Sequence, residues 1–401
     1  MKKLRTPLTF TIHKSAAALP ELWDTLADGN VFLSQAYLEV LETSAPENMQ
    51  CFFISVSNQG RLVAVAVSQF LDLRHVRSFG ERDNCLKTRI RDFVFRRFSS
   101  RVLILGNNML TGQNALRIAA DIDTIPVFEA LHDALDDISA GLKADGMAPH
   151  LFIWKDFYDD ASVAEETFSR YFKFRTQPNM MFDISSEWNS ESDYIAALLK
   201  KYRDQSKRAR KKMLGIVSRE LCLSEISLLA NRIYELYYTV AKNAPFNTFY
   251  LQQGHFLKLK ELLGANFVLN GYFLDNEMIG FSTLIKNGCD IDTYFLGYEE
   301  NCQREKMLYL NMLYDMIGYS VGNRFRRIVF ARTALEIKSS VGAIPVEMFG
   351  FIKHKNPLLN RYMPRLFRFF EPETKWQQRH PFRHQEPQLS SGGEESGYQA
   401  R

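Results

Sequence analysis

Two aspartates in the stretch CDIDTYFLGY (289–298) are the residues best placed for acid–base chemistry. Asp290 and Asp292 alternate with Ile291, so in a strand both carboxylates point to one face. A carboxylate there can take a proton from an attacking amine, and Asp292 is the expected base because it lies deeper in the strand. Tyr298 ends the stretch, where a phenol can protonate a leaving group. The alternatives are a solvated strand face for the carboxylates and half-buried packing for the tyrosine.

Two cations follow a predicted strand near the end of the chain. Arg332 comes directly after the run RRIVFA, and Lys338 lies six residues further on in a predicted short helix. A guanidinium can bind a phosphate or carboxylate through two hydrogen bonds, while an ammonium supplies a compact charge. We expect both side chains to bind an anionic substrate. The alternative is a surface salt bridge with Glu336 or Glu347.

The strongest local charge lies in KKYRDQSKRARKK (200–212), which has eight basic residues and one acid. The whole chain carries +4, so the residues outside this stretch sum to −3. Tyr202, Ser206 and Ala209 recur at helical spacing, which predicts a helix that packs on one side and is cationic on the other. A merely solvated face is the alternative, but it would carry glutamates for i,i+4 pairs. We therefore expect contact with a polyanion. The cations expected to make it include Lys201, Arg203, Lys207 and Arg208.

Composition excludes several other kinds of chemistry. The 401 residues are 46% hydrophobic and 24% charged, as in folded soluble proteins, and the length predicts two domains. The odd number of cysteines, without C-x-x-C spacing, predicts reduced thiols and a cytoplasmic location. The histidines lack metal-ligand spacing, so no metal site is expected, and the common nucleotide-binding motifs are absent. The first residues, MKKLRTPLTFTIHKS, predict no signal peptide, and no apolar run is long enough for a membrane span.

In the second half, periodicity predicts a hairpin-connected sheet followed by alternating helices and strands. Ser190 and Asp193 form a capping-box pattern at the start of its first helix. The predicted elements are a strand at 179–185, a helix from about 190 to 213, a short strand, helices at 224–243 and 249–263, three successive strands, a helix at 305–321, a strand, a short helix at 334–340 and a last strand.

The first half repeats this order more loosely, which we interpret as an internal duplication. Its predicted elements are a hairpin at 51–71, a strand at 101–107, helices at 124–144 and near 160–170, and a strand between these helices. An insertion at 72–100 contains a predicted basic helix. From about Glu371 the chain is polar without periodicity, which predicts a disordered tail. The expected division is therefore 1–176, 177–370 and a tail at 371–401.

This strand–helix order, used twice, resembles the tandem form of the GCN5-related N-acetyltransferase (GNAT) fold, and more narrowly the FemAB-like transferases. One stretch that carries the resemblance is YIAALLKKYRDQSKRARKKMLGI, similar to the basic helix that opens the second domain of that family. Another is FARTALEIKSSVGAIPVEMFGF (330–351), similar to the end of that domain, and GYFLDNEMIGFSTLI between them also fits. The resemblance implies an α/β (α+β) fold of two tandem GNAT-like domains, each a mixed, mostly antiparallel sheet flanked by helices.

The resemblance implies an acyl or aminoacyl transferase, because the peptidoglycan-building FemAB-like members move amino acids from aminoacyl-tRNA. The acceptor would be an amine of a cell-envelope or lipid precursor, and the site a cleft of the second domain with the basic helix nearby. Expected partners are an anionic donor or acceptor (acyl-CoA, acyl-carrier protein or aminoacyl-tRNA) and a membrane surface, to which a cytoplasmic protein would bind peripherally; the oligomeric state is open. The alternative is a catalytically inactive tandem-GNAT module that binds RNA, carrier protein or anionic membrane.

One departure from the GNAT pattern concerns CoA. Acetyl-CoA-binding GNAT domains carry Arg or Gln, two residues, Gly, one residue, and Gly or Ala, where bare backbone N–H groups hold the pyrophosphate. Here the run is QREKML, in which only Gln303 matches, and Lys306 and Leu308 fill the small positions. No tightly bound cofactor is expected; acyl-CoA is at most a co-substrate, with Gln303 a candidate phosphate contact. In the first half, NNMLTGQNA offers Gly112 and Ala115 after a strand.

Overall fold

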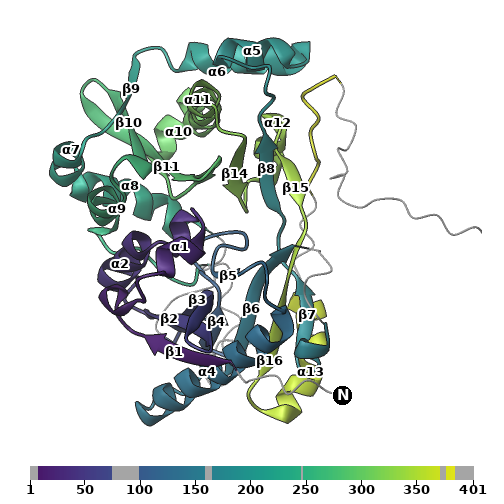
Figure 1. Cartoon of the computed structure of the whole chain (residues 1–401). Helices are drawn as coiled ribbons and strands as arrows, with labels where there is room; N and C mark the ends of the chain where they lie inside the picture. The colour runs from purple at the N-terminus through teal and green to yellow at the C-terminus, as the bar shows by residue number, and fades with distance from the viewer. Residues whose placement is uncertain (1–7, 75–98, 159–164, 245–246, 371–375, 384–401) are drawn as a thin grey trace, which may run out of the picture.

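The computed structural model describes residues 8–74, 99–158, 165–244, 247–370 and 376–383. Its strands form two mixed sheets, one above the other in Figure 1, with helices packed on their faces. The predicted α/β architecture of two similar sheets is therefore confirmed. The basic helix expected in the insertion lies outside the described residues.

The elements of the second half follow the predicted order, whereas the first half also contains elements that were not predicted, and among the described residues the helix expected near 160–170 is represented by a 3₁₀ turn at Glu165–Phe168. Those of the first half are β1 (Thr9–His13), α1 (Trp23–Ala27), α2 (Gln35–Ser44), β2 (Met49–Asn58), β3 (Arg61–Asp72), β4 (Arg101–Leu105), β5 (Leu116–Ile118), α4 (Thr124–Ala144), β6 (Leu151–Tyr158) and β7 (Phe172–Arg175). Those of the second half are β8 (Asn179–Asp183), α5 (Glu191–Ala197), α6 (Lys200–Lys212), β9 (Ile216–Glu220), α7 (Leu223–Leu228), α8 (Ala230–Lys242), α9 (His255–Leu263), β10 (Phe267–Leu274), β11 (Glu277–Asn287), β12 (Asp290–Thr293), β13 (Gly297–Tyr298), α10 (Glu300–Lys306), α11 (Leu308–Gly322), β14 (Arg327–Ala331), α12 (Leu335–Ser340), β15 (Ile344–Val346), β16 (Met348–His354) and α13 (Pro357–Phe370). Short 3₁₀ turns occur at Ala16–Ala18, Val31–Leu33, Glu165–Phe168 and Gly264–Asn266.

The two sheets have the same strand order. The first runs β1-β2-β3-β4-β6-β16-β7, and the second, from its opposite end, runs β9-β10-β11-β12-β14-β8-β15. Along each of these orders the fourth and fifth strands, β4 with β6 and β12 with β14, pair in parallel, whereas the other neighbours pair antiparallel. The repeated topology supports the internal duplication that the sequence suggested.

The first sheet is completed by a strand from the second half. β16, near the end of the chain, lies between β6 and β7 of the first sheet, while β8 lies between β14 and β15 of the second. α13 packs on β16 and β7. The boundary expected after residue 176 therefore does not divide the strands by sheet, because β16 and α13 lie beyond it but belong with the first sheet. An apolar strand pattern shows burial but does not show which sheet the strand enters.

The helix predicted from 190 to 213 is interrupted. The expected capping box opens α5, but the helix ends at Ala197 and α6 begins at Lys200. Between them, the backbone N–H of Leu199 donates to the carbonyl oxygen of Pro381 at 2.7 Å. The C-terminal segment therefore takes over a backbone group that a continuous helix would use itself.

The tail expected to be disordered from residue 371 contains a docked strap at 376–383. Its Phe382 ring stacks on Phe182 and makes edge contact with Tyr194. The backbone N–H of Arg379 donates to Ser339 Oγ at 3.0 Å, which fixes the strap to α12. The expectation of disorder is wrong for these residues, because their few aromatic side chains have a site on the second sheet.

A continuous hydrophobic core joins the two halves. It contains α2 residues such as Tyr37 and Leu41 together with α9 residues such as Phe256 and Leu259. Within the described ranges, no helix is long and apolar enough to cross a membrane.

Replacing Phe382 tests the strap. Phe382→Ala is expected to lower the free energy of unfolding by about 2–3 kcal/mol, because it removes a half-buried ring from an aromatic cluster. Denaturant unfolding measures the change, with Arg383→Ala, an exposed neighbour, as the matched control. Indistinguishable unfolding curves for the two variants would show that the strap does not contribute to the fold.

Candidate active site between the two sheets

Asp292 lies where the second sheet opens. β12 pairs in parallel with β14 as far as Asp292 and Val329, and the hydroxyl of Thr293 then donates to the carbonyl oxygen of Val329 at 3.2 Å. Beyond this point the chain bulges at 294–296, and β13 pairs with β11 alone. The strand predicted over 289–298 is therefore broken in the middle, next to the predicted base.

Burial controls the ionisation of Asp292. The residue is 6% exposed, and burial raises the pKa of its carboxyl to about 7. The amide of Asn287, with Nδ2 3.4 Å from Asp292 Oδ2, opposes this rise in pKa, whereas the charge of Asp290 adds to it. Asn287 is itself held by the first half, because its Oδ1 accepts from the backbone N–H of Val31 at 3.0 Å. The carboxyl thus has a neutral hydrogen-bond partner.

Asp292 faces the first half of the chain. It stands opposite Ile285 on β11, and such partners share one face of a sheet. Ile285 belongs to the core that joins the two halves, and the charge of Asp292 raises the pKa of Tyr37 and of Tyr158, both from the first half. The site is therefore between the sheets, not within a cleft of the second domain alone.

A buried ion-pair centre lies beside this site. Asp156 on β6 is fully buried; its carboxylate pairs with Lys155 at 2.6 Å and with Arg332 from the second half. The backbone N–H of Gly112 donates to the same carboxylate at 3.2 Å. Register shifts mark bulges at equivalent places, in the β6–β16 pairing near Asp156 and in the β14–β8 pairing before Arg332. The duplicated bulges bring the ends of the two strands together.

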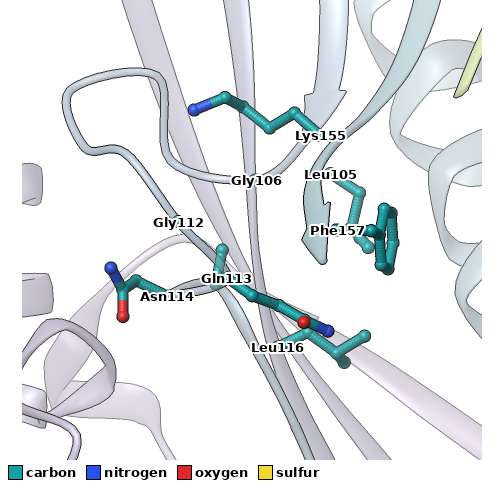
Figure 2. A pocket seen from close by; sticks show the side chains of 9 residues that line it. Leu105, Gly106, Gly112, Gln113, Asn114, Leu116, Lys155 and Phe157 are labelled. Carbon is teal, nitrogen blue, oxygen red and sulfur yellow. The ribbon is translucent and has the colours of Figure 1, made fainter. Parts of the chain in front are cut away.

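The loop at 106–115 closes over the ion-pair centre and lines a small pocket with Leu105, Lys155 and Phe157 (Figure 2). Lys155 Nζ donates to the carbonyl oxygens of Asn107 and Leu110, both at 2.9 Å. A side chain at Gly112 would lie 2.8 Å from the hydroxyl of Tyr158, at a backbone φ of +97°. The glycine is required there by close approach and by conformation.

Tyr158 lies against the loop that closes this centre. Its hydroxyl lies 3.4 Å from the amide Nδ2 of Asn179, on β8. Two buried polar atoms nearby, Asn179 Oδ1 and Arg332 Nε, have no protein hydrogen-bond partner among the described residues. Buried polar groups without a partner are uncommon in folded proteins, and these two lie at the junction of the two halves.

A second polar chain crosses the interface. His255 Nε2 lies 3.0 Å from the hydroxyl of Tyr294, and its Nδ1 lies 2.9 Å from Ser44 Oγ in the first half. Burial lowers the pKa of His255 to about 4, so the ring is neutral near pH 7. From the loop at 106–115, the amide of Asn107 donates to the hydroxyl of Tyr37 at 3.2 Å. These contacts position the loop and α9 against α2.

Arg332 and Lys338 have partners inside the fold. Burial lowers the pKa of Arg332 to about 10, so it stays charged and balances Asp156. Lys338 is buried and donates to the carbonyl oxygens of Phe330 at 2.6 Å and Arg332 at 2.7 Å, and burial lowers its pKa to about 7. This corrects the expectation for Lys338: its ammonium holds the end of β14 and is not presented to a substrate.

Tyr298 and Gln303 lie away from Asp292. Tyr298 pairs with Gly280, whose missing side chain would contact Leu308 and Met312 on α11, so this tyrosine lies on the opposite face of the sheet from Asp292. Gln303 lies in α10, and its backbone N–H donates to the carbonyl oxygen of Glu299 at 2.8 Å. Asp292 and Tyr298, the two residues predicted as catalytic, therefore do not form one site.

The basic helix is confirmed as a packed helix, but it is not beside Asp292. The α6 residues Tyr202 and Ala209 pack in a core that contains Leu284, the neighbour of Ile285 on β11. Since neighbouring strand residues face opposite ways, the sheet separates α6 from Asp292. Lys201, Lys207 and Arg208 are exposed, whereas Arg203 donates to the carbonyl oxygen of Leu198 at 2.5 Å and so has a structural role.

Among the residues that the structure describes, no three His, Cys, Asp or Glu side chains gather as metal ligands.

No known family profile matches the sequence, and no curated protein matches it. Among solved structures, the crystal structure of FemX superposes with a TM-score of 0.51 at 11% identity, covering 90% of this chain and 100% of FemX. A tandem GNAT protein from the clavulanic acid biosynthesis pathway gives a TM-score of 0.48 at 11% identity, over 87% of this chain and 99% of that protein. The duplicated sheets define a tandem GNAT-fold protein. More particularly, the chain has the fold of FemX, which confirms the FemAB-like resemblance at the level of the fold.

Four residues of this junction were not predicted from the sequence: Lys155, Asp156, Tyr158 and Asn179. One signal was available, because FIWKDFY places a charged pair in an otherwise apolar strand, and buried charges need partners. The partner Arg332 lies 176 residues further along the chain, so local spacing could not reveal it.

The ion pair between Arg332 and Asp156 predicts a large coupling energy between these two residues. Arg332→Met is expected to lower the free energy of unfolding by about 3 kcal/mol, because it leaves the buried Asp156 with one cation fewer. A double-mutant cycle with Asp156→Asn should give a coupling energy above about 1 kcal/mol. The control is Arg61→Met, which breaks an exposed pair with Asp121 and should cost less than about 1 kcal/mol. Additive effects of the two interface substitutions would contradict the pairing.

The raised pKa of Asp292 predicts a pH-dependent loss of stability. The folded-state pKa of about 7 exceeds the ordinary aspartate value of 3.8, so the folded state holds the proton more tightly and loses stability as the pH rises through 7. Asp292→Asn removes this loss. Relative to the parent, the variant should gain about 3 kcal/mol in free energy of unfolding between about pH 4 and about pH 8. A difference in free energy of unfolding between variant and parent that is constant with pH would contradict a buried carboxyl with a raised pKa.

Proposed function

We propose that this chain is an N-acyltransferase that transfers an acyl or aminoacyl group to an amine of a cell-envelope or lipid precursor, with Asp292 as the general base. The observation that carries the proposal is the placement of Asp292, which is buried between the halves beside a neutral amide, where burial raises its pKa to about 7. A base whose pKa is near the working pH combines a useful ionised fraction with strong proton affinity. The FemX fold supports the class of reaction.

The proposed reaction needs two proton transfers, one to Asp292 from the amine and one from Asp292 to the leaving group. The amine nitrogen attacks the acyl carbonyl carbon while the Asp292 carboxylate takes the proton from that nitrogen. The bond between the carbonyl carbon and the leaving oxygen or sulfur then breaks, and the leaving group departs with the proton that Asp292 had taken, which restores the carboxylate. Asn287 holds the carboxyl in place through both stages, and its anchor on Val31 joins this step to the position of the first half.

The proposal also concerns the class of acyl donor. At the place where GNAT domains bind the CoA pyrophosphate, α10 uses backbone amides such as that of Gln303 in its own hydrogen bonds. The side chains of Arg304 and Lys306 pair with Glu300 and Glu305. These contacts favour an aminoacyl ester or carrier-bound acyl donor over free acyl-CoA. A catalytically inactive binding module is the alternative, and the exposed cations of α6 are the observation in its favour.

Two aspartate variants on one strand test the base. The purified full chain is assayed by mass spectrometry for acyl transfer to candidate amines from acyl-CoA, acyl-carrier protein and aminoacyl-tRNA. Asp292→Asn is expected to reduce kcat/KM by about 10²–10⁴-fold. In the parent, kcat/KM should rise with pH and level off above about 7, because the base must be ionised.

Asp290→Asn is the matched control. Asp290 pairs with Arg326 at 3.0 Å at the surface, so its replacement should preserve activity. Because the charge of Asp290 raises the pKa of Asp292, the rising limb of the pH profile should move to lower pH in this variant. If the rising limb does not move, it reports the ionisation of the acceptor amine and not that of Asp292. Full activity of Asp292→Asn would exclude Asp292 as the base.

A further inference from the structure

We propose that the outer face of α6 is a docking surface for an anionic lipid bilayer. The helix is about 20 Å long and packs through Tyr202, Ser206 and Ala209. Its opposite arc is exposed and carries one acid, Asp204. The cations of this arc are Lys200, Lys201, Lys207, Arg208, Lys211 and Lys212.

These six cations are not neutralised by the fold. In the ranges that the structure describes, ion pairs form at Arg210, which binds Asp315 at 2.5 Å and Glu191 at 2.6 Å, but at none of the six. The arc therefore keeps a net charge of +5. Lys207 with Lys211 is a like-charged pair at i,i+4, and such pairs destabilise a helix. A face that tolerates this repulsion is expected to meet an anionic surface.

The composition of the arc favours lipid headgroups over other polyanions. Five of the six cations are lysines, which supply point charges rather than the forked contacts of arginine. The arc carries no exposed aromatic side chain on which RNA bases could stack. An acidic protein partner would need an apolar interface centre. A bilayer surface needs charge alone, about 1 kcal/mol for each cation near anionic headgroups.

One apolar residue adjoins the arc. Leu214 lies two residues after the end of the helix and is 72% exposed. Beside Lys211 and Lys212, it is placed to enter the headgroup region while the lysines stay at the surface.

The position of α6 separates this surface from the proposed reaction. The second sheet lies between α6 and Asp292, so docking through α6 leaves the opposite face of the sheet, and the junction of the two halves, free. The surface would hold the protein at the membrane without supplying the proton acceptor. The inference is therefore independent of the proposed function.

Charge reversal on the arc tests the docking surface. Vesicles of phosphatidylcholine, with and without phosphatidylglycerol, are sedimented with the full chain at low and high salt. The parent is expected to bind the anionic vesicles, with binding lost at high salt. Replacing Lys200, Lys207 and Lys211 by Glu should weaken binding by at least about 100-fold. The matched control replaces the exposed Lys14, Lys143 and Lys242 by Glu, with the same change in net charge, and should bind like the parent.

Three results would overturn the proposal. The first is equal sedimentation of the parent with neutral and anionic vesicles. The second is equal loss of binding in the arc and control variants, which would show a response to net charge alone. The third is binding of a structured RNA or an acidic carrier protein that the arc variant loses, without vesicle binding by the parent. Unchanged thermal unfolding of the arc variant shows that the helix remains folded.

Discussion

The first sheet is not complete without β16, a strand from the second half, and this crossing determines the rest of the structure. β16 pairs on both sides within the first sheet, and β8 does so within the second. Separating the halves would remove β16 from between β6 and β7, at the cost of many unpaired backbone groups. The halves therefore hold a fixed relative position, which allows Arg332 to reach Asp156 and Val31 to hold Asn287.

Two buried aspartates illustrate what that fixed junction can do. Asp156 is surrounded by Lys155, Arg332 and the N–H of Gly112, so its negative charge is compensated. Asp292 is buried nearly as deeply but has the neutral amide of Asn287 beside it, and its pKa rises to about 7. A compensated carboxylate is structural, whereas an uncompensated one can exchange its proton near neutral pH. Their contrasting environments give Asp156 a structural role and support the proposed role of Asp292 as a base.

The sequence predicted the elements better than their partners. The helix at 124–144 was predicted with its observed bounds, because its periodicity is strong and Asp123 caps it. Asp292 was identified from strand alternation, which is a local property. The exchange of β16, the burial of Lys338 against carbonyl oxygens and the pairing of Asp156 with Arg332 were not predicted, since each depends on a contact between distant segments. The strap at 376–383 was missed because its polar composition outweighed Phe382.

The central claim is that the junction holds a carboxyl of Asp292 that titrates near neutral pH. Its direct test is the titration of that carboxyl, followed by the ¹³C chemical shift in protein labelled at the aspartate side-chain carboxyl. The signal is assigned by its absence in Asp292→Asn. The expected midpoint is about 7. A midpoint near 4, the value of an ordinary exposed aspartate, would contradict it.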